Sequence, residues 1–446
     1  MFWDMIDDFV YITLFFAIAI LLKKYIPGLK RFIIPNSILA GFVGLILGPN
    51  VLGLIPLDAD GLGTIIYHLM AIGFIALSLR SVKKSKNVNA LNAGIIIVST
   101  YLFQGVLGLA MSFGFNIFDK QIFPGMGLLF PLGFGQGPGQ AFSIGTQWEK
   151  LGLLNGGGAG LAIAASGFAW ATIGGIIILN ILIVNKKKKH EQIQVVPKKE
   201  MMVKDYEFSD MDGLTIQFVI IGVIYFVVFL IIQGLKLLLS DMGDLGATLA
   251  TTLEGFHFVI GALVALLFRK VYDKLFDLGI AEENYLNDFL LHRVSGLVFD
   301  FMVAASIAAV MFSEISGIVF YIVLTSLIIG MGTYGFIYFI VKKTIKSHEI
   351  ENRIGFFGML TGTISTGMSL LREVDPTLKS GTAENLIYGS GMSLFLGAPL
   401  LAILTFPALA LKSGDSMLNV YALFSLFGYG IFLWVLWLVN NRKRNK

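Results

Sequence analysis

The sequence predicts an all-α polytopic membrane protein: an inverted repeat of two five-helix halves, each with a re-entrant loop, plus one extra C-terminal span. Composition is the first reason, because 56% of the 446 residues are hydrophobic and only 14% are charged. Soluble domains are closer to half apolar and about one quarter charged. Length is the second reason, since roughly ten or eleven crossings of about 20 residues fit the chain. The third is a glycine-rich interruption at a matching place in each half.

Apolar runs define the expected spans. In the first half they lie near 9–22, 33–54, 63–79, 92–118 and 156–184; in the second they lie near 214–239, 246–268, 294–312, 316–341 and 386–411, with a last one near 417–439. We therefore expect a first repeat over 1–184, a cytoplasmic linker over 185–213, a second repeat over 214–411, and an additional span with a basic tail over 412–446. Residues 272–292 mix apolar and acidic side chains, which is typical of an amphipathic segment at the cytoplasmic interface.

Two segments cannot cross lipid as plain helices. The first, near 122–147, contains Pro124, Pro131 and Pro138 and the run Gly133-Phe-Gly-Gln-Gly-Pro-Gly-Gln-Ala141. The second, near 355–372, contains Gly358-Met-Leu-Thr-Gly-Thr-Ile-Ser-Thr-Gly-Met-Ser369. Backbone freed from helical bonding is tolerated at membrane depth only where protein buries it or where it lines a polar cavity. Paired interruptions of this kind are typical of the binding site of a secondary transporter.

The distribution of lysine and arginine predicts the orientation. Basic clusters follow the first, third, fifth, seventh, ninth and eleventh expected spans, whereas the intervening loops carry acidic residues such as Asp58 and Asp241. Basic loops stay on the cytoplasmic side, so the N-terminus is expected outside and the C-terminus in the cytoplasm. The alternation works only if each broken segment enters and leaves on one side. Because an odd number of spans precedes the linker, the second half is inverted relative to the first.

Several short stretches resemble the glutamate:sodium symporter family over roughly residues 1–411. They are Phe32-Ile-Ile-Pro35 with Ala40-Gly41, Gly73 through Arg80, the Gly-x-Gly-x-x-Gln-Ala pattern at Gly135–Ala141, Trp148-Glu-Lys-Leu151, and Gly362-Thr-Ile-Ser-Thr-Gly367. The resemblance implies an inverted five-helix repeat, re-entrant loops that meet at mid-membrane, and Na⁺-driven glutamate uptake in the cell membrane. The family's first loop has a Gly-Gly-x-Gly-Thr-Gly core, where this chain has Gln136, Pro138 and Gln140. Its second loop usually has small residues and a proline, and the eleventh span is additional.

The two broken segments supply the candidate substrate site. Glycine lets a ligand approach the backbone closely, and the N-termini of half-helices present free N–H groups and a positive dipole end to a carboxylate. The candidate substrate-binding residues are Gly135, Gln136, Gly137, Gly139, Gln140, Ser143, Thr363, Ser365, Thr366, Gly367 and Arg372. The alternative is that these small residues serve only close helix packing. The Arg372 guanidinium either clamps a substrate carboxylate or anchors the end of the loop at the interface.

Ion coupling is assigned to Asp300, Thr361 and Ser365. Asp300 lies in the otherwise apolar run Val298–Met311, and carboxylates inside a membrane are costly and usually functional. Three roles stay open for Asp300: it ligates Na⁺, it carries a coupling proton, or it pairs with a buried base such as Arg293. The hydroxyls of the broken segments are hard oxygen donors suited to Na⁺.

The sequence therefore predicts a secondary transporter and not an enzyme. No cysteine is present, and neither a Gly-Lys dipeptide nor a His-Glu-x-x-His helix occurs, which excludes thiol chemistry and the common phosphate-loop and zinc-helix motifs. No cofactor other than Na⁺ as coupling ion and no nucleic acid is expected. The expected partners are a small anionic substrate, the lipid bilayer and a second copy in a homodimer. The alternatives are a citrate- or malate-type symporter, a cation/proton antiporter, a channel or a non-transporting sensor.

Overall fold

The computed structural model describes residues 6–26, 34–49, 51–80, 90–187, 212–280, 285–345, 347–375 and 378–444. Every regular element in these residues is helical. Ile33 and Asn50 of the predicted second span, Phe32 of the stretch that carries the family resemblance, and most of the predicted linker 185–213 lie outside the described residues.

The first half of the chain contains ten helical elements in the described residues. They are α1 (Asp7–Tyr25), α3 (Asn36–Leu47), α4 (Ala59–Ser78), α5 (Ala90–Phe118), the 3₁₀ turn η1 (Pro124–Leu128), the π-helical turn η2 (Pro131–Gln136), α6 (Pro138–Glu149), α7 (Gly156–Ala169), the π-helical turn η3 (Trp170–Gly174) and α8 (Gly175–Lys187).

The second half is also built of helices, and these are interrupted at more than one place in the described residues. Its elements are α9 (Gly213–Leu239), η4 (Ser240–Met242), α10 (Gly243–Gly255), α11 (His257–Asp277), α12 (Asp288–Ala308), α13 (Phe312–Ile315), η5 (Ser316–Ile318), α14 (Val319–Thr344), α15 (Glu349–Leu360), α16 (Ile364–Val374), α17 (Thr382–Leu396), α18 (Ala398–Ser413) and α19 (Met417–Arg444).

The helices are long and apolar enough for a polytopic membrane protein, as predicted. In the described residues, 7 helices could each cross a bilayer, and the number rises to 9 if each of two bent pairs forms one span. The bend between α10 and α11 is 65°, and that between α17 and α18 is 53°. The sequence predicts one continuous span at each of these places, so both predictions need correction. Pro399, in the first turn of α18, accounts for the second break because proline cannot continue the hydrogen-bond ladder of the preceding helix.

Two further predictions from the sequence differ from the structure. Of the residues of the predicted span 33–54 that the structure describes (34–49 and 51–54), only 36–47 are helical, which is about 18 Å of helix against roughly 30 Å of hydrocarbon. The backbone turns extended at Gly48, and Pro49 follows. The predicted amphipathic segment 272–292 is also not a separate element, because it is divided between the end of α11 and the start of α12. Arg269 joins these two ends, with its Nε 2.8 Å from Asp273 and its Nη1 3.2 Å from Asp288.

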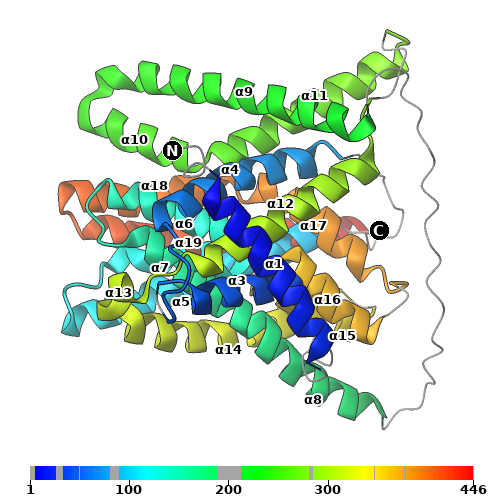
Figure 1. Ribbon diagram of the computed structural model, residues 1–446, viewed down its shortest axis with the longest axis horizontal. Coiled ribbons are helices and arrows are strands. Elements are labelled where there is room, and N and C mark those ends of the chain that lie inside the picture. Colours follow the sequence, from blue (N-terminus) through cyan, green and yellow to red (C-terminus); the bar gives the residue numbers. More distant parts are fainter. Residues whose placement is uncertain are drawn as a thin grey trace.

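The helices pack in two groups that meet across the middle of the molecule. In one group α3 and α4 both pack on α12, and α4 also packs on α11 and α9. In the other group α5 packs on η1, η2, α14 and α17. Figure 1 shows the α9, α10 and α11 hairpin, in green, along one edge of the molecule and α14 and α8 along the opposite edge. The helix α19 lies against α5 and α18.

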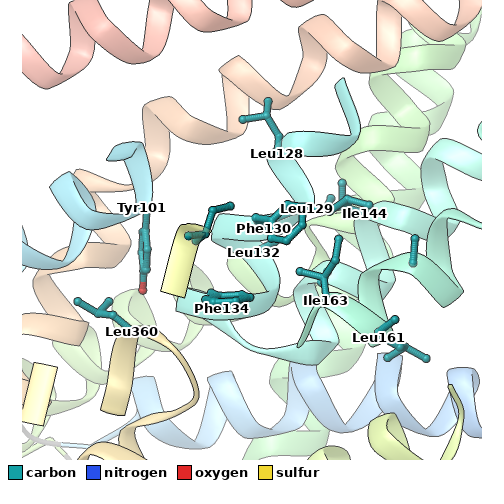
Figure 2. Packing of buried hydrophobic residues seen from close by; sticks show 14 of the residues in the cluster. Tyr101, Leu128, Leu129, Phe130, Leu132, Phe134, Ile144, Leu161, Ile163 and Leu360 are labelled. Atoms are coloured by element: carbon teal, nitrogen blue, oxygen red, sulfur yellow. The ribbon is translucent and has the colours of Figure 1, made fainter. Parts of the chain in front are cut away.

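The densest packing surrounds the first broken segment. Phe130 and Phe134 are fully buried, and Figure 2 shows them beside Leu132 within the cluster. The backbones of α5 and η1 touch here, because a methyl group at Gly108 would lie 2.1 Å from the carbonyl oxygen of Gly127. All of η1 and residues Pro131–Gly135 of η2 are buried inside protein, and Gln136 faces the cavity described below. Burial by protein is the condition under which broken backbone is tolerated at membrane depth.

Candidate functional site

A cavity of about 160 Å³ lies where the two broken segments converge. Its walls come from both halves of the chain. The first half contributes residues of α3, α4, α5, η2 and α6, and the second contributes residues of α11, α12, the break between α15 and α16, and the break between α17 and α18. Segments more than two hundred residues apart in the sequence therefore share one small volume.

The first break is shaped by two prolines and one glycine. Pro131 opens the π-helical turn η2, and Pro138 occupies the first turn of α6. Between them Gly137 has φ 104° and ψ 172°, a conformation open to glycine alone. Its N–H donates to the carbonyl of Leu132, 2.8 Å away. The first N–H groups of a helix have no partner within the helix, and Gly139 and Gln140 of this first turn line the cavity.

The second break ends in a reciprocal cap. Thr363 precedes α16; its N–H donates to the hydroxyl of Thr366 over 2.7 Å, and the N–H of Thr366 donates to the hydroxyl of Thr363 over 3.4 Å. The Thr366 hydroxyl in turn donates to the carbonyl of Gly358, 2.8 Å away in α15. These contacts hold the start of α16 against the end of α15. Ser365, which has no part in the cap, is exposed and lines the cavity.

One helix, α5, holds both broken segments. The phenol of Tyr101 donates to the carbonyl of Gly135 in η2 over 3.0 Å. One turn further along, the side-chain amide of Gln104 donates to the carbonyl of Leu360 over 2.9 Å and to the hydroxyl of Thr333 over 3.1 Å. Figure 2 shows the phenolic oxygen of Tyr101 directed to the region between Leu360 and Phe134. The hydrogen bonds from α5 thus fix η2 and the end of α15 relative to each other.

Asp300 of α12 is the carboxylate of this cavity. Although it sits in an apolar helix, its side chain is exposed and faces the cavity, with the side chain of Ser37 from α3 beside it. Arg293 does not pair with Asp300 in the described chain; its guanidinium lies 5.2 Å over the ring of Phe289. The pairing alternative drawn from the sequence is therefore not the arrangement found. An acidic group and two helix N-termini share the same space.

Most of the residues predicted from the broken segments line the cavity, and five do not. Those that line it are Gly135, Gln136, Gly139, Gln140, Thr363, Ser365 and Thr366, together with Asp300. Gly137 shapes the turn without lining the cavity. Ser143 donates to the carbonyl of Gly255 over 2.9 Å and so ties α6 to the bend before α11. Thr361 donates back to Phe357 over 2.7 Å within α15.

Gly367 and Arg372 lie outside the cavity because of the direction of α16. Gly367 packs against α15, where a methyl group would lie 2.5 Å from the carbonyl oxygen of Gly355. Arg372 is exposed in the last turn of α16, about 12 Å along the axis from Ile364 at eight residues of 1.5 Å each. The helix therefore begins at the cavity and carries Arg372 away from it, which removes the geometry needed for a carboxylate clamp in this conformation.

Most of the other lining residues were missed by the sequence reasoning, and four of them are small residues that need explanation. Ser37 stands at the start of α3, and Ser390, Ser393 and Gly397 come from the bent pair α17–α18. The run Gly397-Ala-Pro399 is a signal that could have placed this third break, because glycine and proline end one helix and begin another. A buried polar atom without a partner is a second sign of a binding site, and only a structure reveals it. The side-chain oxygen of Gln140, a predicted residue, is such an atom in the described residues.

The cavity can bind an anion and a cation side by side. Two helix N-termini offer partial positive charge and free N–H groups, while Asp300 and nearby hydroxyls offer oxygen ligands. Comparison of the sequence with models of protein families and with curated proteins found no match. What supports a function for this chain is therefore the cavity and the packing around it.

Proposed function

We propose that this protein is a secondary active transporter that couples the uptake of glutamate, or of a similar small carboxylate, to Na⁺ by alternating access. It would act in the plasma membrane, with its N-terminus outside and its C-terminus in the cytoplasm. One observation carries the proposal. The first turns of α6 and α16, from opposite halves of the chain, line one cavity together with Asp300.

The anion-binding part of the proposal rests on the helix starts. In the first turn of α6 Pro138 has no N–H, so the backbone donors nearest the cavity are those of Gly139 and Gln140. In α16 the N–H of Thr366 is used by its cap, which leaves those of Ile364 and Ser365. Two separate N-termini suit a ligand with two negative groups. A cavity of about 150 Å³ holds a molecule the size of benzene, so the observed volume suits a small metabolite.

The cation-binding part rests on Asp300 and its neutral oxygen neighbours. Ser37 already contacts the carboxylate, and Thr363 and Ser365 line the same cavity. Hydroxyl and carbonyl oxygens with a single carboxylate are ligands for a hard monovalent cation. A cation there would also offset the cost of holding an ionised carboxylate inside the membrane, so cation and anionic substrate would favour each other's binding.

The packing of the helices supports an inverted repeat with re-entrant loops. If α4 corresponds to α12 and α3 to α11, a two-fold relation requires that contacts occur in reciprocal pairs. They do: α3 packs on α12 while α4 packs on α11, and α5 packs on α17 while α14 packs on α7. Transporters built from such repeats place the substrate at the interface of the halves, beside broken helices.

Uptake into proteoliposomes tests the proposal. We expect saturable uptake of labelled glutamate, or of another small carboxylate from a panel that includes citrate and malate, only when an inward Na⁺ gradient is imposed. Full uptake driven by a proton gradient with Na⁺ absent would contradict the coupling, and Na⁺ or H⁺ exchange without any carboxylate would favour an antiporter. Flux that does not saturate would favour a channel.

A further inference from the structure

A second hollow of about 410 Å³ lies between α5, α14 and α19, away from the site described above. Its walls are almost wholly apolar, with aromatic rings from α14 (Phe336 and Phe339) and from α19 (Phe427 and Trp434). The helix α19 buries only 17% of its most apolar stretch, so this side of the molecule faces lipid. The function proposed above does not use this groove.

The length of the groove matches one leaflet of a bilayer. Along α19 the lining residues run from Leu426 to Trp437, and along α5 from Ile95 to Val106. Each stretch covers eleven steps of 1.5 Å, or about 16 Å. The hydrocarbon core of a bilayer is about 30 Å thick, so the groove spans roughly half of it. One acyl chain, lying along the membrane normal, has this length.

The polar groups of the groove all lie at one end. The helix α5 runs antiparallel to α19, because Asn440 near the end of α19 donates to Asn92 near the start of α5 over 3.1 Å. It also runs antiparallel to α14, because Ser112 near the end of α5 contacts Tyr321 at the start of α14. The lining residues at that end are Ser99 of α5, Lys343 and Thr344 of α14, and Trp437 of α19. Lys343 extends over the ring of Phe339, with its Nζ 4.3 Å from the ring centroid. This places a positive charge at one end of the apolar groove.

An unused hydrogen-bond donor lies at the same end. The indole N–H of Trp437 is buried and has no partner in the described residues. A buried donor without a partner is costly, and tryptophan at a membrane interface usually directs its N–H to a polar group. A lysine and an indole N–H that line the same end of the groove are complementary to a phosphate. The Lys342-Lys343 end of α14 belongs to a basic cluster, which assigns it to the cytoplasmic side.

We propose that this groove is a binding site for an anionic phospholipid of the cytoplasmic leaflet. One acyl chain would lie between α5, α14 and α19, and the headgroup phosphate would accept from Lys343 and from the indole of Trp437. The cytoplasmic leaflet carries anionic lipids that attract basic residues at the membrane surface. The occupant is thus defined by three features of the groove: its apolar walls, its length and its charged end.

Native mass spectrometry of the detergent-purified protein tests this site. The protein is incubated with equal amounts of dioleoyl phosphatidylglycerol and dioleoyl phosphatidylcholine, which have the same chains and different headgroup charge. We expect the wild-type protein to retain phosphatidylglycerol preferentially. Lys343→Gln should lower its retention about fivefold, in line with the contribution of one lysine at an anionic lipid surface. Lys342→Gln is the matched control, because Lys342 is the exposed neighbour on the same helix and does not line the groove.

A glycine pair tests the apolar part separately. Gly430 lines the groove, and a methyl group there would lie 3.9 Å from Leu102, so Gly430→Leu should fold and fill the groove. Retention of both lipids should fall in this variant. Gly428→Leu should leave it unchanged, because nothing lies within 4 Å of a methyl group at Gly428 and that residue does not line the groove.

Three results would overturn the proposal. They are equal retention of the two lipids by the wild-type protein, an equal loss in the Lys343 and Lys342 variants, and protection of the groove by a second copy of the chain in a dimer that retains no lipid. Because Lys343→Gln changes only an exposed side chain, the test holds even if Gly430→Leu fails to fold. Phosphatidylglycerol with brominated chains gives an independent readout, since it should quench the fluorescence of Trp434 and Trp437.

Discussion

The phenol of Tyr101 donates a hydrogen bond to the backbone carbonyl of Gly135, 3.0 Å away, and so fixes the π-helical turn that lines the cavity. The carbonyl belongs to backbone that cannot complete an α-helical ladder. A side chain from the neighbouring helix α5 therefore supplies a hydrogen bond that the broken segment cannot make within its own backbone.

Tyr101→Phe should loosen the first break while the packing of the ring is kept. We expect the unfolding free energy to fall by about 1 kcal/mol, the scale of a side-chain hydrogen bond within a membrane protein. Apparent substrate affinity should weaken together with it. Thermal unfolding in detergent and uptake into proteoliposomes measure the two effects. Tyr421→Phe, on an exposed tyrosine of α19, is the control and should change neither.

Gly137→Ala tests the backbone of the break without changing any contact. A methyl group at Gly137 has nothing within 4 Å, yet φ is 104°. The cost therefore comes from conformation alone, about 1–3 kcal/mol for a non-glycine residue held in such a region. Thermal unfolding should report it, and uptake should fall. Gly114→Ala in α5 also meets nothing within 4 Å but is helical, so it should be neutral or stabilising. Equal behaviour of the two variants would show that Gly137 tolerates a side chain.

Asp300→Asn keeps the shape of the side chain and removes its charge. We expect uptake to lose its dependence on Na⁺ and to fall strongly, because a neutral amide is a weak ligand for the cation. Initial rates measured against Na⁺ concentration test this. Asp60→Asn, on an exposed carboxylate in the first turn of α4, should behave like the wild-type protein. Unchanged ion dependence in the Asp300 variant would assign Asp300 a structural role instead.

Arg372→Lys separates the two roles predicted for this residue. Lysine keeps the charge but loses the bidentate fork. Since Arg372 is exposed at the far end of α16 and does not line the cavity, we expect apparent substrate affinity and expression to stay unchanged. A weaker apparent affinity with normal expression would support the carboxylate clamp. It would mean that this end of α16 reaches the substrate in another conformation.

The natural lack of cysteine permits labelling in the wild-type background. Gln136 and Ser365 both line the cavity, one from each break. A cysteine at Gln136 should react with a membrane-impermeant thiol reagent added outside, and one at Ser365 when the reagent is on the cytoplasmic side. Substrate with Na⁺ should protect both, because one ligand would fill the space between them. Labelling of both positions only from one side, under every ligand condition, would argue against an inverted pair of re-entrant loops.

Much of the cavity could be predicted because proline and glycine act locally. Pro131, Gly137 and Pro138 break the helix whatever its surroundings, and Thr363 and Thr366 form a cap within four residues at the start of α16. The faces of the helices could not be predicted in this way. Whether Ser143 or Gln140 points to the cavity depends on the rotation of α6, which packing against α7 sets. The run Gly397-Ala-Pro399 could have placed the break after α17, but nothing in the sequence shows that Ser390, Ser393 or Ser37 faces the cavity, so only tertiary packing identifies them.

Gly139, in the first turn of α6, lies between two sulfur atoms: a methyl group there would be 2.8 Å from Met70 Sδ and 2.9 Å from Met302 Sδ. Met70 belongs to α4 and Met302 to α12, the central helices of the group that faces α5 and the broken segments. Thioether side chains have three rotatable bonds and fill irregular space easily. In the alternating access proposed above, Met70 and Met302 would change rotamers as one group of helices moves along the other, and so would keep the space beside Gly139 filled throughout the movement.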